Sequence, residues 1–188
     1  MKKGKLVGIV TDRDLKRASA SDATTLEIHE LLYLLSKIRV EEIMTINPIT
    51  VPADFTIEEA AEVLLKNKIS GLAVVDSAGE LVGVITQTDI FRVLISLTGV
   101  GKKGIQFAFL LKDQPGSIKT IADIIRKHGG RMVSILTSYE LAPQGYRKVY
   151  IRMYDIDRAN LAKLKAELKQ NAKLLYIVDH PENKREIY

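Results

Sequence analysis

GKLVGIVTDRDLKRA, residues 4–18, is followed later in the chain by a second version of itself, GELVGVITQTDIFRV, residues 79–93. Seven of the fifteen paired positions are identical, at a constant offset of 75 residues. The identical pairs include Thr11 with Thr86 and Asp14 with Asp89. An internal repeat marks a structural unit that is used more than once. Both segments are therefore expected to adopt one local fold.

Each copy is expected to run from a strand into a helix. The apolar, β-branched runs 6–10 and 81–85 predict strands, and Thr11 and Thr86 are expected to begin the helices. The second helix, residues 86–97, has apolar residues at helical spacing that are expected to face inward: Ile90, Phe91, Leu94 and Ile95.

More elements are predicted ahead of the second copy. An amphipathic helix is expected over residues 24–37, and a short strand over 49–51. Thr56 and Glu59 form a capping-box pattern in front of an apolar helical run. A strand over 72–75 and the turn over 76–79 complete a hairpin with the strand of the second repeat.

The segment TGVGKKG, residues 98–104, contains three glycines and predicts a linker. The rest of the chain predicts alternating strands and helices in the order β-α-β-β-α-β, the ferredoxin-like arrangement. The expected strands and helices cover 105–111, 118–128, 132–139, 147–154, 157–170 and 174–178.

The repeat, with VEEIMTINPITV and GLAVVD between its copies, resembles a CBS-domain pair, also named a Bateman module. The second half resembles an ACT domain through its strand order and its DQPGS turn, residues 113–117. The whole combination resembles bacterial acetoin-utilization proteins. The resemblance implies an α+β protein in which a CBS-domain pair with a partial first copy precedes a ferredoxin-like βαββαβ ACT domain. The implied parts are a partial first CBS unit with a connector helix (1–39), a second CBS unit (40–98), a linker (99–104), an ACT-like domain (105–180) and a C-terminal tail (181–188).

The first copy departs from the family pattern. The second copy has about forty residues, from Val40 to Gly79, ahead of its repeat, and a complete first copy would need a similar stretch before Gly4. Without that stretch, apolar residues such as Leu6 and Ile9 are expected to favour dimerisation, because uncovered apolar surface tends to find a partner.

The repeated residues suit a nucleotide. A helix N-terminus attracts phosphate, and a carboxylate can accept two hydrogen bonds from neighbouring ribose hydroxyls. The resemblance implies a regulatory adenine nucleotide (AMP, ATP or S-adenosylmethionine), with Thr near phosphate, Asp on ribose and an apolar slot for adenine. The implied residues are Thr11, Asp14, Ile49, Thr50, Ser70, Gly71, Leu72, Ala73, Gly83, Thr86 and Asp89. Thr-x-x-Asp at a helix start is also a variant of the capping box, which needs no ligand.

A second binding site is expected in the ACT-like half. The turn Asp113, Gln114, Pro115, Gly116, Ser117 precedes a helix whose N-terminus favours a carboxylate, while Asp113 suits an ammonium group. The resemblance implies a free amino acid there. The same residue types also make an ordinary strand-to-helix turn.

Composition narrows the remaining classes. The chain has no cysteine, its net charge of +5 is scattered, and no apolar run approaches the length of a membrane span. We expect a cytoplasmic homodimer without a signal peptide, a required cofactor, a metal site, or a nucleic-acid or membrane partner. His29, His128 and His180 show no metal-ligand spacing or catalytic pattern. A sensor of a small-molecule effector is preferred over an enzyme, and a non-catalytic interaction scaffold is the alternative.

Overall fold

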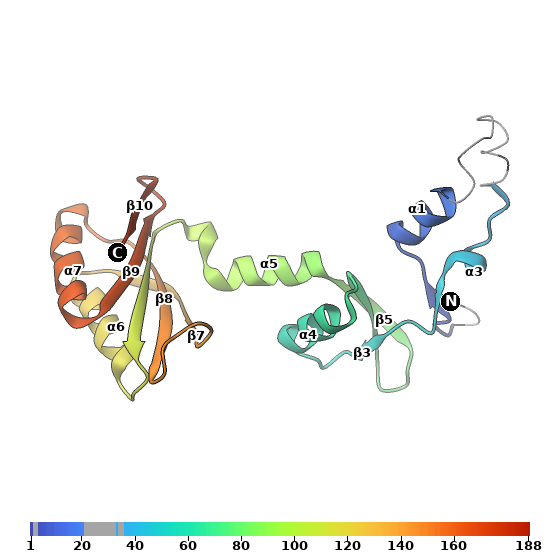
Figure 1. Ribbon diagram of the computed structural model, residues 1–188, viewed down its shortest axis with the longest axis horizontal. Coiled ribbons are helices and arrows are strands. Elements are labelled where there is room, and N and C mark those ends of the chain that lie inside the picture. Colours follow the sequence, from blue (N-terminus) through green and yellow to red (C-terminus); the bar gives the residue numbers. More distant parts are fainter. Residues whose placement is uncertain (2–3, 21–32, 34–35) are drawn as a thin grey trace. The chain divides into compact units, whose positions relative to one another are not determined.

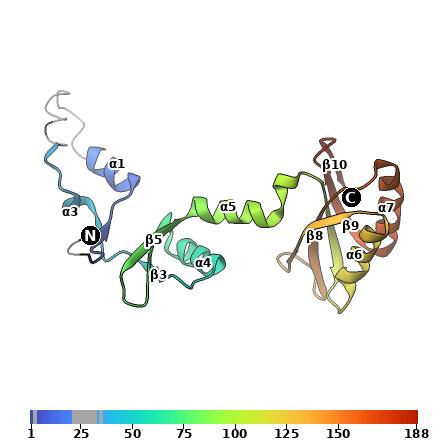
Figure 2. The ribbon, with the colours of Figure 1, turned by 180° about the vertical axis from the view of Figure 1, so that it is seen from behind.

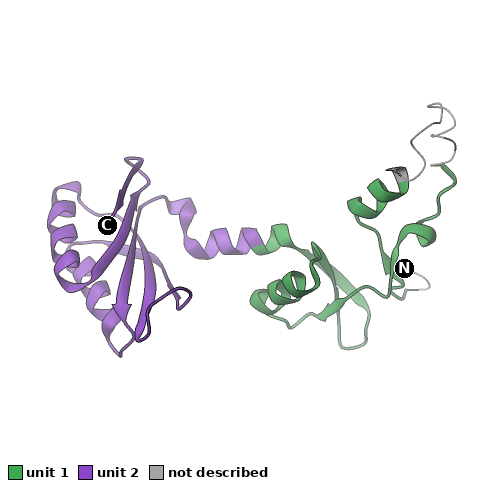
Figure 3. Cartoon of the chain, viewed as in Figure 1, with its two compact units in different colours: residues 1–90 green, residues 91–188 purple. Residues whose placement is uncertain are grey.

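The computed structural model describes residues 1, 4–20, 33 and 36–188. The chain divides into two compact units, residues 1–90 and 91–188 (Figure 3). The helix predicted over 24–37 lies largely outside the described residues. The domain bounds given above stay a prediction. No helix in the described part of the chain is long and apolar enough to cross a membrane.

Unit 1 contains two small sheets (Figure 1). Strand β1 pairs antiparallel with β2, while β4 is the middle strand of the second sheet, parallel to β3 and antiparallel to β5. A parallel pair needs a crossover, which α4 supplies between β3 and β4. In chain order, the elements are β1 (Gly8–Ile9), α1 (Asp12–Ala20), α3 (Val40–Ile43), β2 (Thr45–Ile46), β3 (Thr50–Pro52), α4 (Ile57–Asn67), β4 (Gly71–Val75) and β5 (Leu81–Thr86).

Helix α4 begins at the predicted capping box. The Thr56 side chain accepts a hydrogen bond from the Glu59 amide at 3.3 Å, and the Glu59 carboxylate accepts one from the Thr56 amide at 2.7 Å. The helix ends at Lys68, whose φ of 54° closes it in the left-handed region. Its apolar face supplies Ala60 and Leu64 to the small core of unit 1.

The repeat also shares its turn. Gly4 has a φ of +84° and Gly79 a φ of +78°. Both glycines therefore occupy a backbone region that L side chains rarely adopt. The repeat thus preserves the tight turn that leads into β1 and β5.

Helix α5 (Gln87–Thr98) follows β5 as predicted, but its apolar residues are not buried. Phe91, Leu94 and Ile95 are 59%, 52% and 55% exposed, so the expectation that they face inward is wrong for this chain. Ile90 alone of the four packs against the core of unit 1. Helical spacing predicts that these side chains share a face, but it does not tell what covers that face.

Unit 2 has the predicted β-α-β-β-α-β order and one additional strand. Its antiparallel sheet has the order β10-β9-β6-β8-β7, so the first four strands in sequence lie as in a ferredoxin-like fold. Both helices pack on one face of the sheet (Figure 2). In chain order, the elements are η1 (Val100–Lys102), β6 (Ile105–Lys112), α6 (Ser117–Lys127), β7 (Arg131–Ser138), β8 (Tyr146–Tyr154), α7 (Arg158–Asn171), β9 (Lys173–Asp179) and β10 (Lys184–Ile187).

The core of unit 2 lies between the sheet and its helices. Alternate residues of β6, including Phe107 and Phe109, meet Ile121 and Ile125 of α6 and Leu164 of α7. Each of these side chains is at most 1% exposed. Alternation along β6 and a helical period along α6 predict this arrangement, because each element offers one apolar face.

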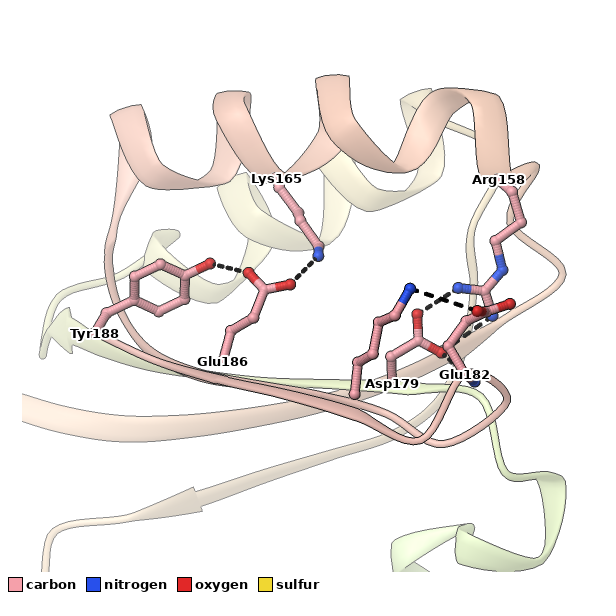
Figure 4. A network of polar contacts seen from close by, with 7 residues as sticks. Arg158, Lys165, Asp179, Glu182, Glu186 and Tyr188 are labelled. Atoms are coloured by element: carbon pink, nitrogen blue, oxygen red, sulfur yellow. Dashed lines mark hydrogen bonds and ion pairs between the residues drawn. The ribbon is translucent and has the colours of Figure 1, made fainter.

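Strand β10 occupies part of the segment predicted to be a tail. It pairs antiparallel with β9, and polar side chains attach the hairpin to α7 (Figure 4). Glu186 accepts hydrogen bonds from Lys165 and from the Tyr188 hydroxyl, both at 2.5 Å. Burial and this bond to Glu186 raise the pKa of Tyr188 to about 12. The sequence KREI has little apolar alternation, which explains why the strand was not predicted.

A second ion pair lies at the start of α7 (Figure 4). Arg158 donates two hydrogen bonds to Asp179, one of them at 3.1 Å, and Asp179 also accepts one from the Glu182 amide at 3.2 Å. Asp179 is only 4% exposed. Burial opposes its ionisation, but the bonds from Arg158 and Glu182 outweigh it and lower the pKa of Asp179.

We predict that Asp179→Asn lowers the free energy of unfolding of unit 2 by about 1 to 3 kcal/mol at neutral pH, because it removes charge-assisted bonds from a buried group. Because the pKa of Asp179 is lower in the folded state, its contribution to the free energy of unfolding is complete above the unfolded-state pKa near 4. This contribution is lost as the pH falls through the folded-state pKa. Urea unfolding of the variant and the wild type, followed between pH 7 and about 2.5, checks this. Exposed Asp157→Asn is not a suitable control, because Asp157 caps α7. A difference from the wild type that stays constant down to the lowest pH would contradict the assignment.

Candidate functional site

Unit 1 contains a cavity of about 470 Å³ to which both copies of the repeat contribute. Thr11 and Asp14 line it from the first copy, and Thr86 lines it from the second. The other walls come from the segment around Pro48 and from the loop that joins α4 to β4. The predicted nucleotide residues in its lining are Thr11, Asp14, Ile49, Ser70, Gly71 and Thr86.

The two strand-to-helix turns have the same hydrogen bonds. In the second copy, Asp89 Oδ2 accepts from the Thr86 amide at 2.9 Å and from its hydroxyl at 2.6 Å. In the first copy, Asp14 Oδ2 accepts from the Thr11 amide at 2.9 Å and hydroxyl at 2.7 Å. Each Thr hydroxyl lies within 3.4 Å of the amide of its Asp. The Thr-x-x-Asp pattern is therefore a reciprocal helix cap in both copies.

The cap of the first copy leaves the second carboxylate oxygen of Asp14 for other use. These bonds involve Oδ2, and a carboxylate has a second oxygen that can accept further hydrogen bonds. Hydrogen bonds from the Thr11 hydroxyl and amide lower the pKa of Asp14. A group that stays ionised at neutral pH is a good acceptor for hydroxyl donors. Capping and ligand binding are thus compatible roles for the same aspartate.

Several predicted residues lie outside the cavity lining as described. Leu72 and Ala73 are fully buried in the sheet, at 0% and 1% exposure, and Thr50 is exposed on β3. Asp89 lies in the cap beneath Thr86. Gly83 has open space where a side chain would begin, whereas a Cβ on Gly8, its counterpart, would meet Met44. The repeated glycines therefore have different surroundings.

Three cations that the sequence did not single out line the cavity: Arg13, Arg17 and Lys68. No ion pair joins any of them to another residue in the described part of the chain, whereas Asp12 of the same wall is paired with Lys16 at 3.1 Å. The recurrence of Arg17 as Arg92 in the repeat was a sequence signal for one of them. Lys68 gave none, because its position depends on where α4 ends.

The start of α5 is joined to the cavity wall. The Gln87 amide donates to the Ser70 carbonyl at 3.0 Å, and the Gln87 side chain donates to the Ile69 carbonyl at 3.3 Å. The first turn of α5 and the loop that lines the cavity are therefore connected by two hydrogen bonds.

The second predicted site, residues 113–117, forms the turn between β6 and α6. Gly116 begins α6 with a φ of +84°, and nothing lies near the position of a Cβ there. Arg147 of β8 lies beside this turn, with its Nε 3.4 Å from Asp113 and an Nη donating to Ser117 at 3.3 Å. Tyr139 also donates to Asp113, at 3.4 Å. The sequence did not indicate Arg147 for this site, because strand pairing brings it there.

Comparison with known proteins identifies the first half of the chain. A family model described as the CBS domain matches residues 40–96. A curated CBS domain-containing protein of Dictyostelium discoideum is 35% identical over 94 residues, which are 50% of this chain and 65% of that protein. An uncharacterized protein of Methanocaldococcus jannaschii is 32% identical over an alignment of 116 residues, with 50% of this chain and 69% of that protein covered. The chain belongs to the CBS-domain family.

Other CBS-domain proteins extend the range of relatives. The inosine-5'-monophosphate dehydrogenase of Thermoplasma acidophilum is 40% identical over 90 residues, but the match covers only 15% of that enzyme and 48% of this chain. A solved CBS domain pair in complex with 5'-methylthioadenosine and S-adenosyl-L-methionine is 36% identical, with 50% of this chain and 67% of that chain covered and a TM-score of 0.40. The CBSX2 protein in complex with AMP is 33% identical, with 50% and 66% covered and a TM-score of 0.38.

We predict that Asp89→Ala reduces amide protection at the first turn of α5 by about 2- to 30-fold, the loss expected for removing a helix cap worth about 0.5 to 2 kcal/mol. Hydrogen exchange read by mass spectrometry over residues 86–91 checks this. Thr88→Ala, at an exposed position one residue earlier, is the matched control. Unchanged protection in Asp89→Ala would mean that the cap does not stabilise the helix.

Proposed function

We propose that this CBS-domain protein senses an adenine nucleotide, which binds in the cavity of unit 1. The observation that carries the proposal is that Thr11 and Thr86, equivalent residues of two repeats, line one cavity. Each offers a helix N-terminus, where backbone amides and the helix dipole favour phosphate. Asp14 lies within the same wall and suits the hydroxyls of a ribose.

The charge of the wall favours a ligand that carries phosphate. Arg13, Arg17 and Lys68 line the cavity without ion-pair partners among the described residues, so an anion would compensate them. S-adenosylmethionine has a sulfonium cation and no phosphate, so these three cations favour ATP or AMP over it. AMP is bound in one of the two solved complexes above, and S-adenosyl-L-methionine with 5'-methylthioadenosine in the other.

An interaction scaffold without a nucleotide is the second candidate. The observation in its favour is the exposed apolar face of α5, formed by Phe91, Leu94 and Ile95. The geometry shared by the two caps is equally consistent with a purely structural role. Nucleotide binding separates the two candidates, because a scaffold predicts none.

We also propose that unit 2 is an ACT domain that binds a free amino acid beside the 113–117 turn. The strand order of its sheet and the two helices on one face support the fold assignment. Arg147 would hold the carboxylate together with the start of α6, and Asp113 would hold the ammonium group. Homodimerisation, a cytoplasmic location, a regulatory rather than enzymatic role and a part in acetoin utilization stay predictions from the sequence resemblance.

We predict that ATP and AMP raise the melting temperature of the full chain at millimolar concentration, and that S-adenosylmethionine has a smaller effect, because a ligand that binds the folded state stabilises it. Lys68→Asn should weaken ATP binding about fivefold to tenfold, the effect of one lost charge-assisted phosphate contact. Asn suits this position because it tolerates the left-handed backbone of Lys68. Isothermal titration calorimetry gives the affinities.

The matched control is Lys66→Gln, which removes a positive charge two residues before Lys68. The Lys66 side chain is not part of the cavity lining. If Lys66→Gln and Lys68→Asn weaken ATP equally, long-range attraction and not a local contact explains the effect. If no adenine nucleotide changes melting temperature or gives heat, the sensor proposal fails and the scaffold remains.

For unit 2 we predict that one or more free amino acids bind the wild type and that Arg147→Gln abolishes this binding while leaving ATP affinity unchanged. The loss follows from removing the cation beside Ser117 and Asp113. Titration calorimetry with the twenty amino acids checks it. The control is Lys148→Gln, a change at a partly buried position of the same strand, used once its circular dichroism spectrum matches the wild type. Absence of heat with every amino acid would contradict the proposed site.

A further inference from the structure

The C-terminal end of α5 is attached to the sheet of unit 2 through one carbonyl group. The Thr98 carbonyl accepts hydrogen bonds from Arg152 Nε and from the Ser134 hydroxyl, both at 2.9 Å. Thr98 is the last residue of the helix, where carbonyl groups lack partners within the helix. A positive charge at this end also interacts favourably with the helix dipole.

Arg152 lies at the centre of a row of side chains across three strands. It is the register partner of Ser134 on β7 and of Gln106 on β6. Besides Thr98, its guanidinium donates to the Lys103 carbonyl at 2.8 Å and to the Gln106 side chain at 3.1 Å. One side chain thus connects the end of α5, the segment after it and the sheet.

The burial of Arg152 is unusual for a cation. The residue is 4% exposed, and no carboxylate in the described part of the chain forms an ion pair with it. Charged side chains are rarely buried without a partner of opposite charge. Its charge is compensated by oxygen atoms of neutral groups, among them the carbonyl of Thr98 at the end of α5 and the carbonyl of Lys103 in the segment that follows. A flexible segment would not supply such a fixed set of acceptors.

The glycines of this segment are packed, not free. A Cβ on Gly99, whose φ is +65°, would lie 2.2 Å from Val133 Cγ1. A Cβ on Gly104, whose φ is +60°, would lie 2.2 Å from the Met153 carbonyl oxygen. The carbonyl of Gly104 also accepts a hydrogen bond from the His180 amide at 3.1 Å. The glycines that predicted a linker therefore permit close packing at a sharp corner.

We propose that Arg152 is a positioning residue that fixes the end of α5 to the sheet of unit 2, so that residues 98–104 form a rigid joint. The helix held at Thr98 is the helix whose first turn is capped by Thr86 and Asp89 and joined to the cavity wall through Gln87. We further infer that this joint transmits occupancy of the cavity to unit 2 as a coupling free energy, an inference that rests on the proposed nucleotide site.

The joint is tested without any ligand, by hydrogen exchange on the full chain. In Arg152→Met, the amides that donate to the carbonyls of Ser96, Gly99 and Val100 should exchange about tenfold faster or more. The reason is that the corner, residues 98–104, loses its charge-assisted bonds. Amides of β6 and β9 in the core should keep their protection. Arg131→Met, which removes an exposed arginine from the neighbouring strand, should change neither region.

Two further variants keep the test decisive. Ser134→Ala removes one of the two donors to Thr98 and should give a smaller increase in the same amides. Arg152→Lys keeps the charge but cannot reach three acceptors, so it should resemble Arg152→Met. Unchanged exchange over residues 99–103 in Arg152→Met, or an equal increase through the whole of unit 2, would overturn the joint, since the second result describes general destabilisation.

Transmission is tested by repeating the exchange measurement with saturating ATP. The wild type should show altered protection over residues 99–103, and Arg152→Met should bind ATP without that change. If ATP binds and the corner is unaffected in the wild type, transmission is wrong although the nucleotide site stands. If no adenine nucleotide binds, the proposed function and transmission fail together, while the ligand-free comparison still decides the joint.

Discussion

The reciprocal hydrogen bonds between a threonine and the aspartate three residues later organise unit 1. At Thr86 and Asp89 they end a strand and begin a helix within one turn, and Thr11 and Asp14 repeat the arrangement. A cap places free backbone amides and the positive end of the helix dipole at a defined point. Because both caps lie at one cavity, the element that stabilises each helix also creates the polar surface to which a phosphate could bind.

Unit 2 depends on the placement of a few charges in an otherwise apolar sheet and helix layer. Asp179 is buried but bonded to Arg158, which holds its pKa low, whereas Arg152 is buried among neutral oxygens. The first arrangement attaches α7 to the β9–β10 hairpin, and the second attaches the end of α5 to the sheet. In both, burial makes the hydrogen bonds difficult to lose, because a buried group left unpaired costs more than the bond contributes.

The two units are therefore connected by a helix with a defined beginning and a defined end. Gln87 joins its first turn to the loop at Ser70, and Arg152 and Ser134 hold its last carbonyl. Its apolar residues between these points, such as Phe91 and Leu94, remain exposed and offer surface for a partner. A CBS-domain protein built in this way has the elements that a regulatory response needs: a cavity, a helix that begins beside it and a joint at the other end.

The sequence alone determined the repeat, the glycine turns at Gly4 and Gly79, and most strands and helices, because these depend on local spacing and on backbone preferences that a single segment carries. It also determined the alternative between a cap and a ligand site at Asp89 without deciding between them. Tertiary structure alone brought Arg17 and Lys68 to one cavity, placed Arg147 beside Asp113, and converted the glycine-rich segment at 98–104 into a packed corner. Those results depend on contacts between residues far apart in the chain, and no local pattern records which carbonyl a distant arginine will reach.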